Sequence, residues 1–122
     1  MALDVPECVR LYIDQRGGID GIKALVPPEE KARYASRIFH ALASPVRLKI
    51  LHLLAERPLC PCILVQAIGI ASSKLSYHLS SLQSARLIRG EQRGRWIMYE
   101  LTPLGRDMLR VGESLAVEGE SK

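Results

Sequence analysis

The hydrophobic positions along the chain are spaced first as in helices and then, after Gly90, as in the strands of a hairpin. In "PPEEKARYASRIFHALAS" the apolar positions Ala35, Ile38, Phe39 and Leu42 recur at i, i+3, i+4 and i+7. This spacing puts them on one side of a helix, so the segment is predicted to form an amphipathic helix.

The next segment, "ASPVRLKILHLLAERP", is predicted to be a second helix. Ser44 is expected at the N-cap and Pro45 at the first helical position, where the missing N–H has no intrahelical partner to lose. Pro58 marks the end. The inner side is apolar and consists of Leu48, Ile50, Leu51 and Leu54. His52 lies on the opposite, polar stripe, so we expect a solvated histidine and not a metal ligand.

The segment "CPCILVQAIGIASSKLSYHLSSLQSARLI" combines a short apolar helix, a break at Gly69 and a further helix. Two short helices joined by a tight glycine turn are typical of a helix-turn-helix. Leucines line the inner side of the second helix, which leaves small polar side chains on its outer face. Small side chains let a helix enter the major groove of DNA closely. The alternative is a helix face that is exposed to solvent and binds nothing, but such a face would carry more Glu and Lys. The expected DNA-contacting residues are Ser72, Ser73, Lys74, Ser76, Tyr77 and Ser81. His78 borders the leucines and is expected to pack or hydrogen-bond locally.

Alternating positions in "LIRGEQRGRWIMYELT" predict a β-hairpin that turns at Gly94. Arg93 and Arg95 flank the glycine, so two long cations project from the tip and are expected to meet DNA phosphates or enter the minor groove. Thr102 is then expected to cap a last helix. Its apolar positions, Leu104, Met108, Val111 and Leu115, would suit a partner helix or, alternatively, a core-facing stripe.

Composition and charge place these elements in one ordinary globular domain that binds a polyanion. Of the 122 residues, 48% are hydrophobic and 25% are charged, with a net charge of +4. Residues 31–110 hold 13 Lys/Arg against 4 Asp/Glu, whereas residues 1–30 and 111–122 are net acidic. No apolar run is long enough to span a membrane and no signal peptide is evident, so we expect a cytoplasmic location. Enzyme chemistry has no support, because no acid and base are paired at a useful spacing and no phosphate-binding glycine loop is present.

The segments "ALASPVRLKILHLL", "SSKLSYHLSSLQSARLI" and "RGRWIMYELT", with a Cys-x-Cys between the first two, resemble the ArsR/SmtB family of winged-helix repressors over roughly residues 35–105. The resemblance implies a mainly α fold with a small β-hairpin wing. It also implies a homodimer that binds a palindromic operator in double-stranded DNA and leaves it when an effector binds. We expect residues 1–30 to be a dimer-associated extension, residues 31–102 the DNA-binding core, and residues 103–122 a dimerisation helix with a short acidic tail.

The three cysteines are the candidate effector site. An odd number of thiols in a reducing compartment argues against a disulfide framework. Pro61 suits the first position of a helix, which makes Cys60 the N-cap and Cys62 the second helical residue. The positive end of that helix is expected to lower the pKa of both thiols. Two thiolates select soft ions such as As(III), Cd(II), Pb(II), Zn(II) or Cu(I).

The resemblance also limits this metal site. Arsenic and cadmium/lead sensors of the family carry Cys-x-Cys at the corresponding place, but the third cysteine of the arsenite sensors is Val65 here and the usual Asp is Ile63. Cys8 from the other subunit is the candidate third ligand. Taken alone, Cys8 lies beside Val9, Leu11 and Tyr12 and is expected to be a buried helix residue. The family's second site on the last helix is not expected, because no histidine follows His78. Three alternatives stay open: a reversible Cys60–Cys62 disulfide, two inert buried cysteines, and a winged helix that docks proteins without touching DNA.

Overall fold

The computed structural model describes residues 4–120, with side chains described for residues 4–115. The chain divides into two compact units, Met1–Ala35 and Ser36–Lys122. The first unit contains α1 (Glu7–Gln15) and α2 (Ile19–Lys23), joined through Gly17 and Gly18. Neither helix has a buried residue. Cys8 is exposed, so the expectation that it is a buried helix residue is wrong for the single chain.

The helix α3 (Glu29–Leu42) forms where the spacing of apolar residues predicts it. Two glutamates in its first turn match the positive end of the helix dipole. Only part of the predicted apolar face is covered, because Ile38 is buried and Leu42 half-buried, whereas Ala35 is exposed and Phe39 is 65% exposed.

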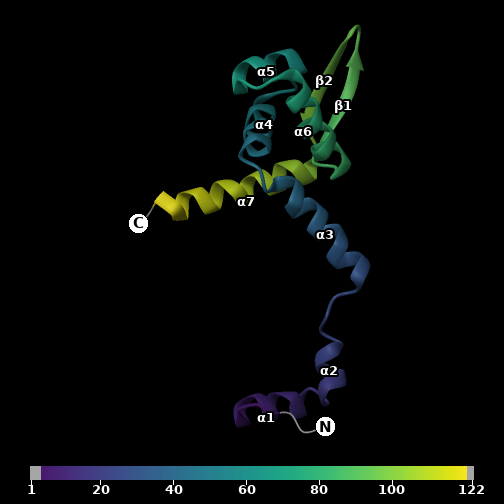
Figure 1. The fold of residues 1–122 in the computed structure, drawn as a ribbon, viewed down its shortest axis with the longest axis vertical. Helices are drawn as coiled ribbons and strands as arrows, with labels where there is room; N and C mark the ends of the chain where they lie inside the picture. Colours follow the sequence, from purple (N-terminus) through teal and green to yellow (C-terminus); the bar gives the residue numbers. More distant parts are fainter. Residues whose placement is uncertain (1–3, 121–122) are drawn as a thin grey trace. The chain divides into compact units, whose positions relative to one another are not determined.

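The second unit is a winged helix-turn-helix (Figure 1). Its helices are α4 (Pro45–Glu56), α5 (Pro61–Ile68), α6 (Ser72–Ser84) and α7 (Pro103–Glu120). Between α6 and α7, β1 (Ile88–Arg93) and β2 (Trp96–Leu101) pair in an antiparallel hairpin, with Ile88 opposite Leu101 and Arg93 opposite Trp96. The predicted mainly α fold with a hairpin wing is confirmed.

The predicted helix ends are also confirmed. The Ser44 hydroxyl caps α4 by accepting a hydrogen bond from the Arg47 backbone N–H at 3.3 Å. Cys60 is the N-cap of α5 and Pro61 its first residue. Gly69 ends α5 in the left-handed conformation (φ 79°), which a side chain would disfavour. Thr102 caps α7, since its Oγ1 accepts from the Gly105 N–H at 3.1 Å.

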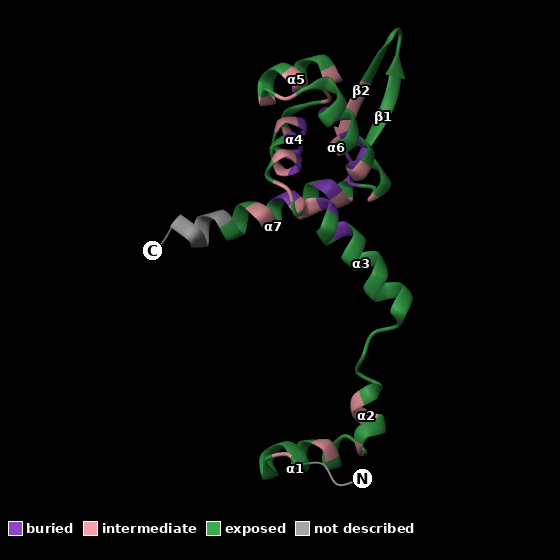
Figure 2. Ribbon diagram, viewed as in Figure 1, coloured by how far each residue is buried: buried purple, intermediate pink, exposed green. Residues whose placement is uncertain are grey.

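The core lies among α4, α5, α6 and the bases of the hairpin and α7 (Figure 2). Its fully buried large side chains are Ile50, Leu51, Leu54, Leu64, Leu75, Leu82, Leu87 and Ile88. Burial of each such side chain stabilises the folded state by about 1.5–3 kcal/mol. The core therefore holds α6 in a fixed orientation relative to the elements on which it packs.

No single helix in the described part of the chain combines the length and apolar composition needed to cross a membrane. One bent pair, Glu29–Leu42 with Pro45–Glu56, meets both criteria only when its helices are taken together.

Candidate nucleic-acid interface

The outer face of α6 is exposed and polar. Leu75, Leu79 and Leu82 are buried as predicted, which turns the opposite side of the helix to solvent. The exposed residues on that side include Ser72, Ser73, Lys74, Ser76 and Tyr77, and Ser81 is partly exposed. Within the described chain, the side chains of Ser72, Ser73, Lys74 and Ser76 make no hydrogen bond or ion pair. They are therefore available to base edges or phosphates.

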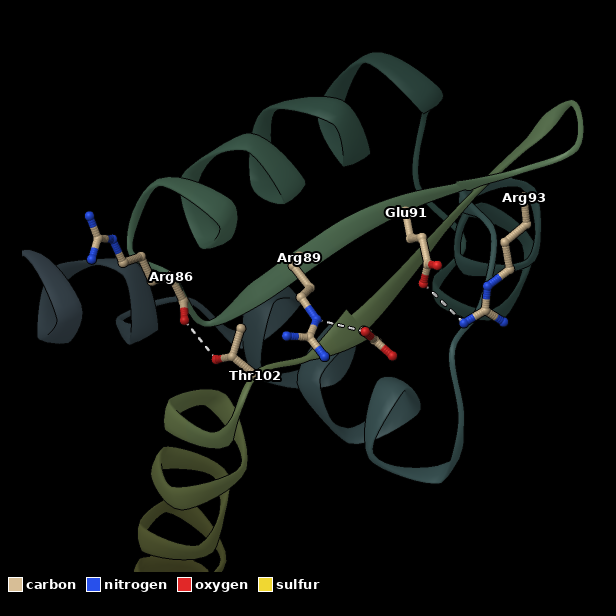
Figure 3. A network of polar contacts seen from close by, with 6 residues as sticks. Arg86, Arg89, Glu91, Arg93 and Thr102 are labelled. Atoms are coloured by element: carbon tan, nitrogen blue, oxygen red, sulfur yellow. Dashed lines mark hydrogen bonds and ion pairs between the residues drawn. The ribbon is translucent and has the colours of Figure 1, made fainter.

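The tip of the hairpin presents two cations. Gly94 adopts φ 63° in the turn, and the Gln92 side-chain amide donates to its carbonyl at 2.8 Å. Arg93 pairs with Glu91 at 3.2 Å on the same strand (Figure 3), and the Arg95 guanidinium lies 5.9 Å from the centre of the Trp96 ring. Exposed contacts of this kind are weak, so both arginines can exchange them for phosphate contacts.

The base of the hairpin joins three elements. The Thr102 hydroxyl donates to the Arg86 carbonyl at 2.6 Å, while the same oxygen caps α7 (Figure 3). Arg86 follows α6 with φ 63°, a left-handed conformation that a non-glycine residue rarely adopts. Arg89 and Glu100 pair across the strands at 2.6 Å. The segment that follows α6 is therefore bonded, through Thr102, to the point where β2 ends and α7 begins.

Sequence reasoning missed Arg47, which is only 6% exposed. Its Nε donates to His78 Nδ1 at 3.0 Å and its Nη1 donates to the Ala41 carbonyl at 3.3 Å. Its guanidinium also lies 5.4 Å from the centre of the Tyr77 ring. Arg47 thus connects the end of α3 with two residues of α6. The sequence contains a signal for its burial. Arg47 precedes Ile50, Leu51 and Leu54 at helical spacing and so lies on the same side of the helix as these apolar residues.

His78 was expected to pack or hydrogen-bond locally, and its Nδ1 accepts a hydrogen bond from Arg47, which lies 31 residues earlier in the chain. Burial lowers the pKa of His78, and the nearby positive charges of Arg47 and Lys74 lower it further. The imidazole is therefore neutral near pH 7, with Nδ1 free to accept the Arg47 proton.

We expect the free energy of unfolding to fall in acid because of His78. The histidine pKa is about 6.5 in the unfolded chain and lower in the folded one, so unfolding takes up a proton below that pH. The stabilising contribution is complete above about pH 6.5 and is lost as the pH falls toward the folded-state pKa. Urea unfolding at about pH 7.5 and about pH 5.5 should show a steeper loss for wild type than for His78→Gln. Equal losses in both proteins would contradict this assignment.

The cysteine pair lies at the start of α5 with the two sulfurs 2.7 Å apart. A hydrogen bond from Cys62 lowers the pKa of Cys60, and the backbone N–H of Ile63 lowers it further. The pKa of Cys62 is raised, first by its hydrogen bond to Cys60 and then by burial. The expectation of two activated thiols is therefore wrong for Cys62, because a close pair shares one proton and only Cys60 gains thiolate character.

The thiol pair lies near both candidate DNA-binding elements. Cys62 and Pro61 line a hollow of about 350 Å³ that Ser72 and Ser76 of α6 also line. On the other side, Leu59 exchanges two backbone hydrogen bonds with Tyr99 of β2, at 3.1 and 2.9 Å. A change at the thiols therefore has a short path to the recognition helix and to the wing.

Within the described residues, no three His, Cys, Asp or Glu side chains are grouped so as to hold a metal ion. Cys60 and Cys62 supply two soft donors, and Cys8 belongs to the first unit. The acids of α7 are surface residues: Asp107 pairs with Arg110 at 3.2 Å, and Glu113 lies 3.9 Å from the exposed His52. Cys62 is exposed, which disfavours the alternative of two buried, inert cysteines.

Part of this chain is similar in sequence to known proteins. Residues 44–89 match the family model described as bacterial regulatory protein, arsR family. The arsenical resistance operon repressor of Bacillus subtilis is 41% identical over 73 residues, which are 59% of this chain and 70% of that protein. The transcriptional repressor SmtB homolog of Synechocystis is 36% identical over 72 residues, 59% of this chain, and the match spans only 54% of that relative's length.

The fold has a solved counterpart in the homodimeric winged helix-turn-helix DNA-binding domain of Mb0332 from Mycobacterium bovis. The two chains are 25% identical with a TM-score of 0.67, over 76% of this chain and 90% of that one. Sequence, hairpin, recognition helix and Cys-x-Cys lead to the same conclusion: the chain belongs to the ArsR/SmtB family of winged helix-turn-helix regulators.

Proposed function

We propose that this chain is a cytoplasmic transcriptional repressor that binds palindromic operator DNA as a homodimer and is released by a soft metal or metalloid ion. The observation that carries the proposal is the position of the Cys60–Cys62 pair. Its sulfurs lie 2.7 Å apart, beside Ser72 and Ser76 of the recognition helix and one residue from the backbone bridge to β2. An ion bound there would act on both elements that meet DNA.

The donor set favours As(III), Cd(II), Pb(II), Zn(II) or Cu(I), because these ions prefer thiolates. Cys60 already has a lowered pKa, and a bound ion would displace the proton from Cys62 as well. A two-sulfur site is incomplete for these ions. Cys8 of the partner subunit is our candidate for the third ligand, and its exposure in the single chain leaves it accessible.

Exposed apolar residues support the homodimer. Phe39 of α3 is 65% exposed, and Val111 and Leu115 of α7 are 52% and 63% exposed. Large apolar side chains on two helices are costly to leave in water, and a second copy would cover them. A two-fold dimer would place its two α6 helices in successive major grooves, about 34 Å apart.

A thiol redox switch is the second candidate, favoured by the short sulfur–sulfur distance and the single activated thiol. Hydrogen peroxide would oxidise the Cys60 thiolate to a sulfenic acid, and the Cys62 sulfur would displace water to close the disulfide. Two thiols and one peroxide would yield one disulfide and two waters. The same two residues would then sense peroxide in place of a metal.

The arginines at the hairpin tip provide a test of DNA binding. Arg93→Ala and Arg95→Ala are each expected to weaken binding to mixed-sequence DNA and to flatten its salt dependence by about 0.9 in log–log slope per lost phosphate contact. Fluorescence anisotropy at several salt concentrations measures both quantities. Glu91→Gln is the matched control, because it frees Arg93 from its ion pair and should not reduce the slope.

Wild-type protein with no salt-dependent affinity for DNA would support a protein-docking winged helix instead. Unchanged slopes in both arginine variants, with wild type binding normally, would contradict the assignment of the hairpin as a DNA-contacting wing.

A further inference from the structure

A second groove lies between the C-terminal half of α3 and the recognition helix. Its volume is about 490 Å³, and Arg37 and His40 line it on the α3 side. On the α6 side it is lined by Tyr77, Ser80 and Ser84, and the guanidinium of Arg47 contributes to its wall. None of Arg37, His40, Ser80 and Ser84 belongs to the DNA-contacting set predicted from the sequence.

The charged residues that line the groove are all basic. No Asp or Glu is among its lining residues, whereas Arg37 and Arg47 are cations. Within the described chain, the side chains of Arg37 and His40 have no hydrogen-bond or ion-pair partner. By contrast Arg33, one turn earlier on the same helix, pairs with Glu29 at 3.2 Å. Arg37 has Arg33 and Ala41 at the corresponding spacings, so the helix itself supplies no counter-ion.

The groups that line the groove are donors suited to a single tetrahedral anion. Arg37 offers a planar fork of N–H groups, and hydroxyls one turn apart, at Ser80 and Ser84, face the same space. Arg47 adds a positive charge that cannot swing away, because its Nε and Nη1 are bonded to His78 and Ala41. Phosphate oxygens only accept hydrogen bonds, and this wall of donors and cations matches that requirement.

We propose that this groove binds a phosphate group. The favoured source is a phosphodiester of the operator backbone, because Tyr77 and Ser81 belong both to the groove and to the predicted DNA-contacting face of α6. A free phosphate or phosphate ester presents the same chemistry. The assignment of the bound phosphate to the DNA backbone rests on the proposed DNA-binding function. The proposal that the groove binds a phosphate group does not.

The salt dependence of DNA binding separates these cases. Arg37→Gln keeps a polar, hydrogen-bonding side chain, although a shorter one, and removes the positive charge. It should lower the log–log salt slope by about 0.9 and weaken binding to operator and mixed DNA by the same factor. Arg57→Gln is the matched control, because Arg57 is equally exposed and lies outside the groove. Its slope should equal that of wild type.

A second readout uses inorganic phosphate at constant ionic strength, followed by the amide NMR shifts of Ser80 and Ser84. Saturable shifts that disappear in Arg37→Gln, with an unchanged DNA slope, would assign the site to free phosphate and keep the groove proposal. A reduced salt slope in Arg37→Gln, with an unchanged slope in Arg57→Gln, would assign the site to a phosphodiester of the DNA backbone. If wild type binds DNA but neither readout responds to Arg37→Gln, the groove proposal is overturned while DNA binding stands. If wild type does not bind DNA, the proposed function fails and the phosphate titration alone decides the groove.

Discussion

Replacement of Cys60 or Cys62 by serine is expected to abolish metal-induced release from DNA. Wild-type protein should lose about 5-fold to 150-fold in operator affinity when the ion binds, the usual range of coupling between two sites. Serine is nearly the same size as cysteine but provides no thiolate, so the soft ion loses a ligand while the start of α5 is retained. Each variant should bind DNA as the metal-free wild type does, with or without the ion.

Two measurements on reduced protein check this result. Titration with Cd(II), followed by thiolate-to-metal absorbance, reports the number of sulfur ligands, and anisotropy with labelled DNA reports release. Cys8→Ser is the informative companion: a weakened site would show that the partner subunit contributes its thiol, and an unaffected site would remove Cys8 from the ligand set. Cd(II)-induced release that persists in both Cys60→Ser and Cys62→Ser would exclude the proposed metal site at these two cysteines.

Truncation of Arg47 to alanine is expected to lower the free energy of unfolding by about 2–3 kcal/mol. Two acceptors, His78 Nδ1 and the Ala41 carbonyl, lose their donor, and a nearly buried side chain leaves a gap behind. Tyr77 also loses the cation beside its ring, so we expect weaker DNA binding even where the variant remains folded. Urea unfolding at about pH 7.5 measures the stability change.

The comparison variants for Arg47 are a lysine at the same site and an alanine at a surface arginine. Arg47→Lys keeps the charge but lacks the planar fork that reaches two acceptors, so an intermediate loss is expected. Arg57→Ala should change stability by no more than about 0.5 kcal/mol, because its side chain is exposed. A loss for Arg47→Ala as small as that for Arg57→Ala would show that the buried contacts of Arg47 do not support α6.

Most of the fold could be predicted because its signals are local. Ser44, Cys60 and Thr102 cap helices through contacts with residues within a few positions, and Gly69 and Gly94 adopt the positive φ angles that turns require. The leucines of α6 predicted its buried side, and thereby the face that remains for DNA.

The features that could not be predicted depend on contacts between distant segments. Arg47 and His78 are 31 residues apart, and the groove opposite Ser80 and Ser84 exists only because α3 packs near α6. The different pKa values of Cys60 and Cys62 follow from the direction of one hydrogen bond, which residue types do not specify. Cys8 was expected to be buried on the basis of its apolar neighbours, but the first unit has too few elements to cover it.

The side chains that face outward on α6 have a consequence for how this protein could diversify. Ser72, Ser73, Lys74 and Ser76 support no other part of the described chain, whereas the leucines on the opposite side and the Thr102 junction hold the helix in place. Exchange of the outward residues should therefore alter which base pairs are preferred while leaving the folded state almost unaffected. After gene duplication, a few such exchanges would give a copy with a different outer surface on α6 and the same fold.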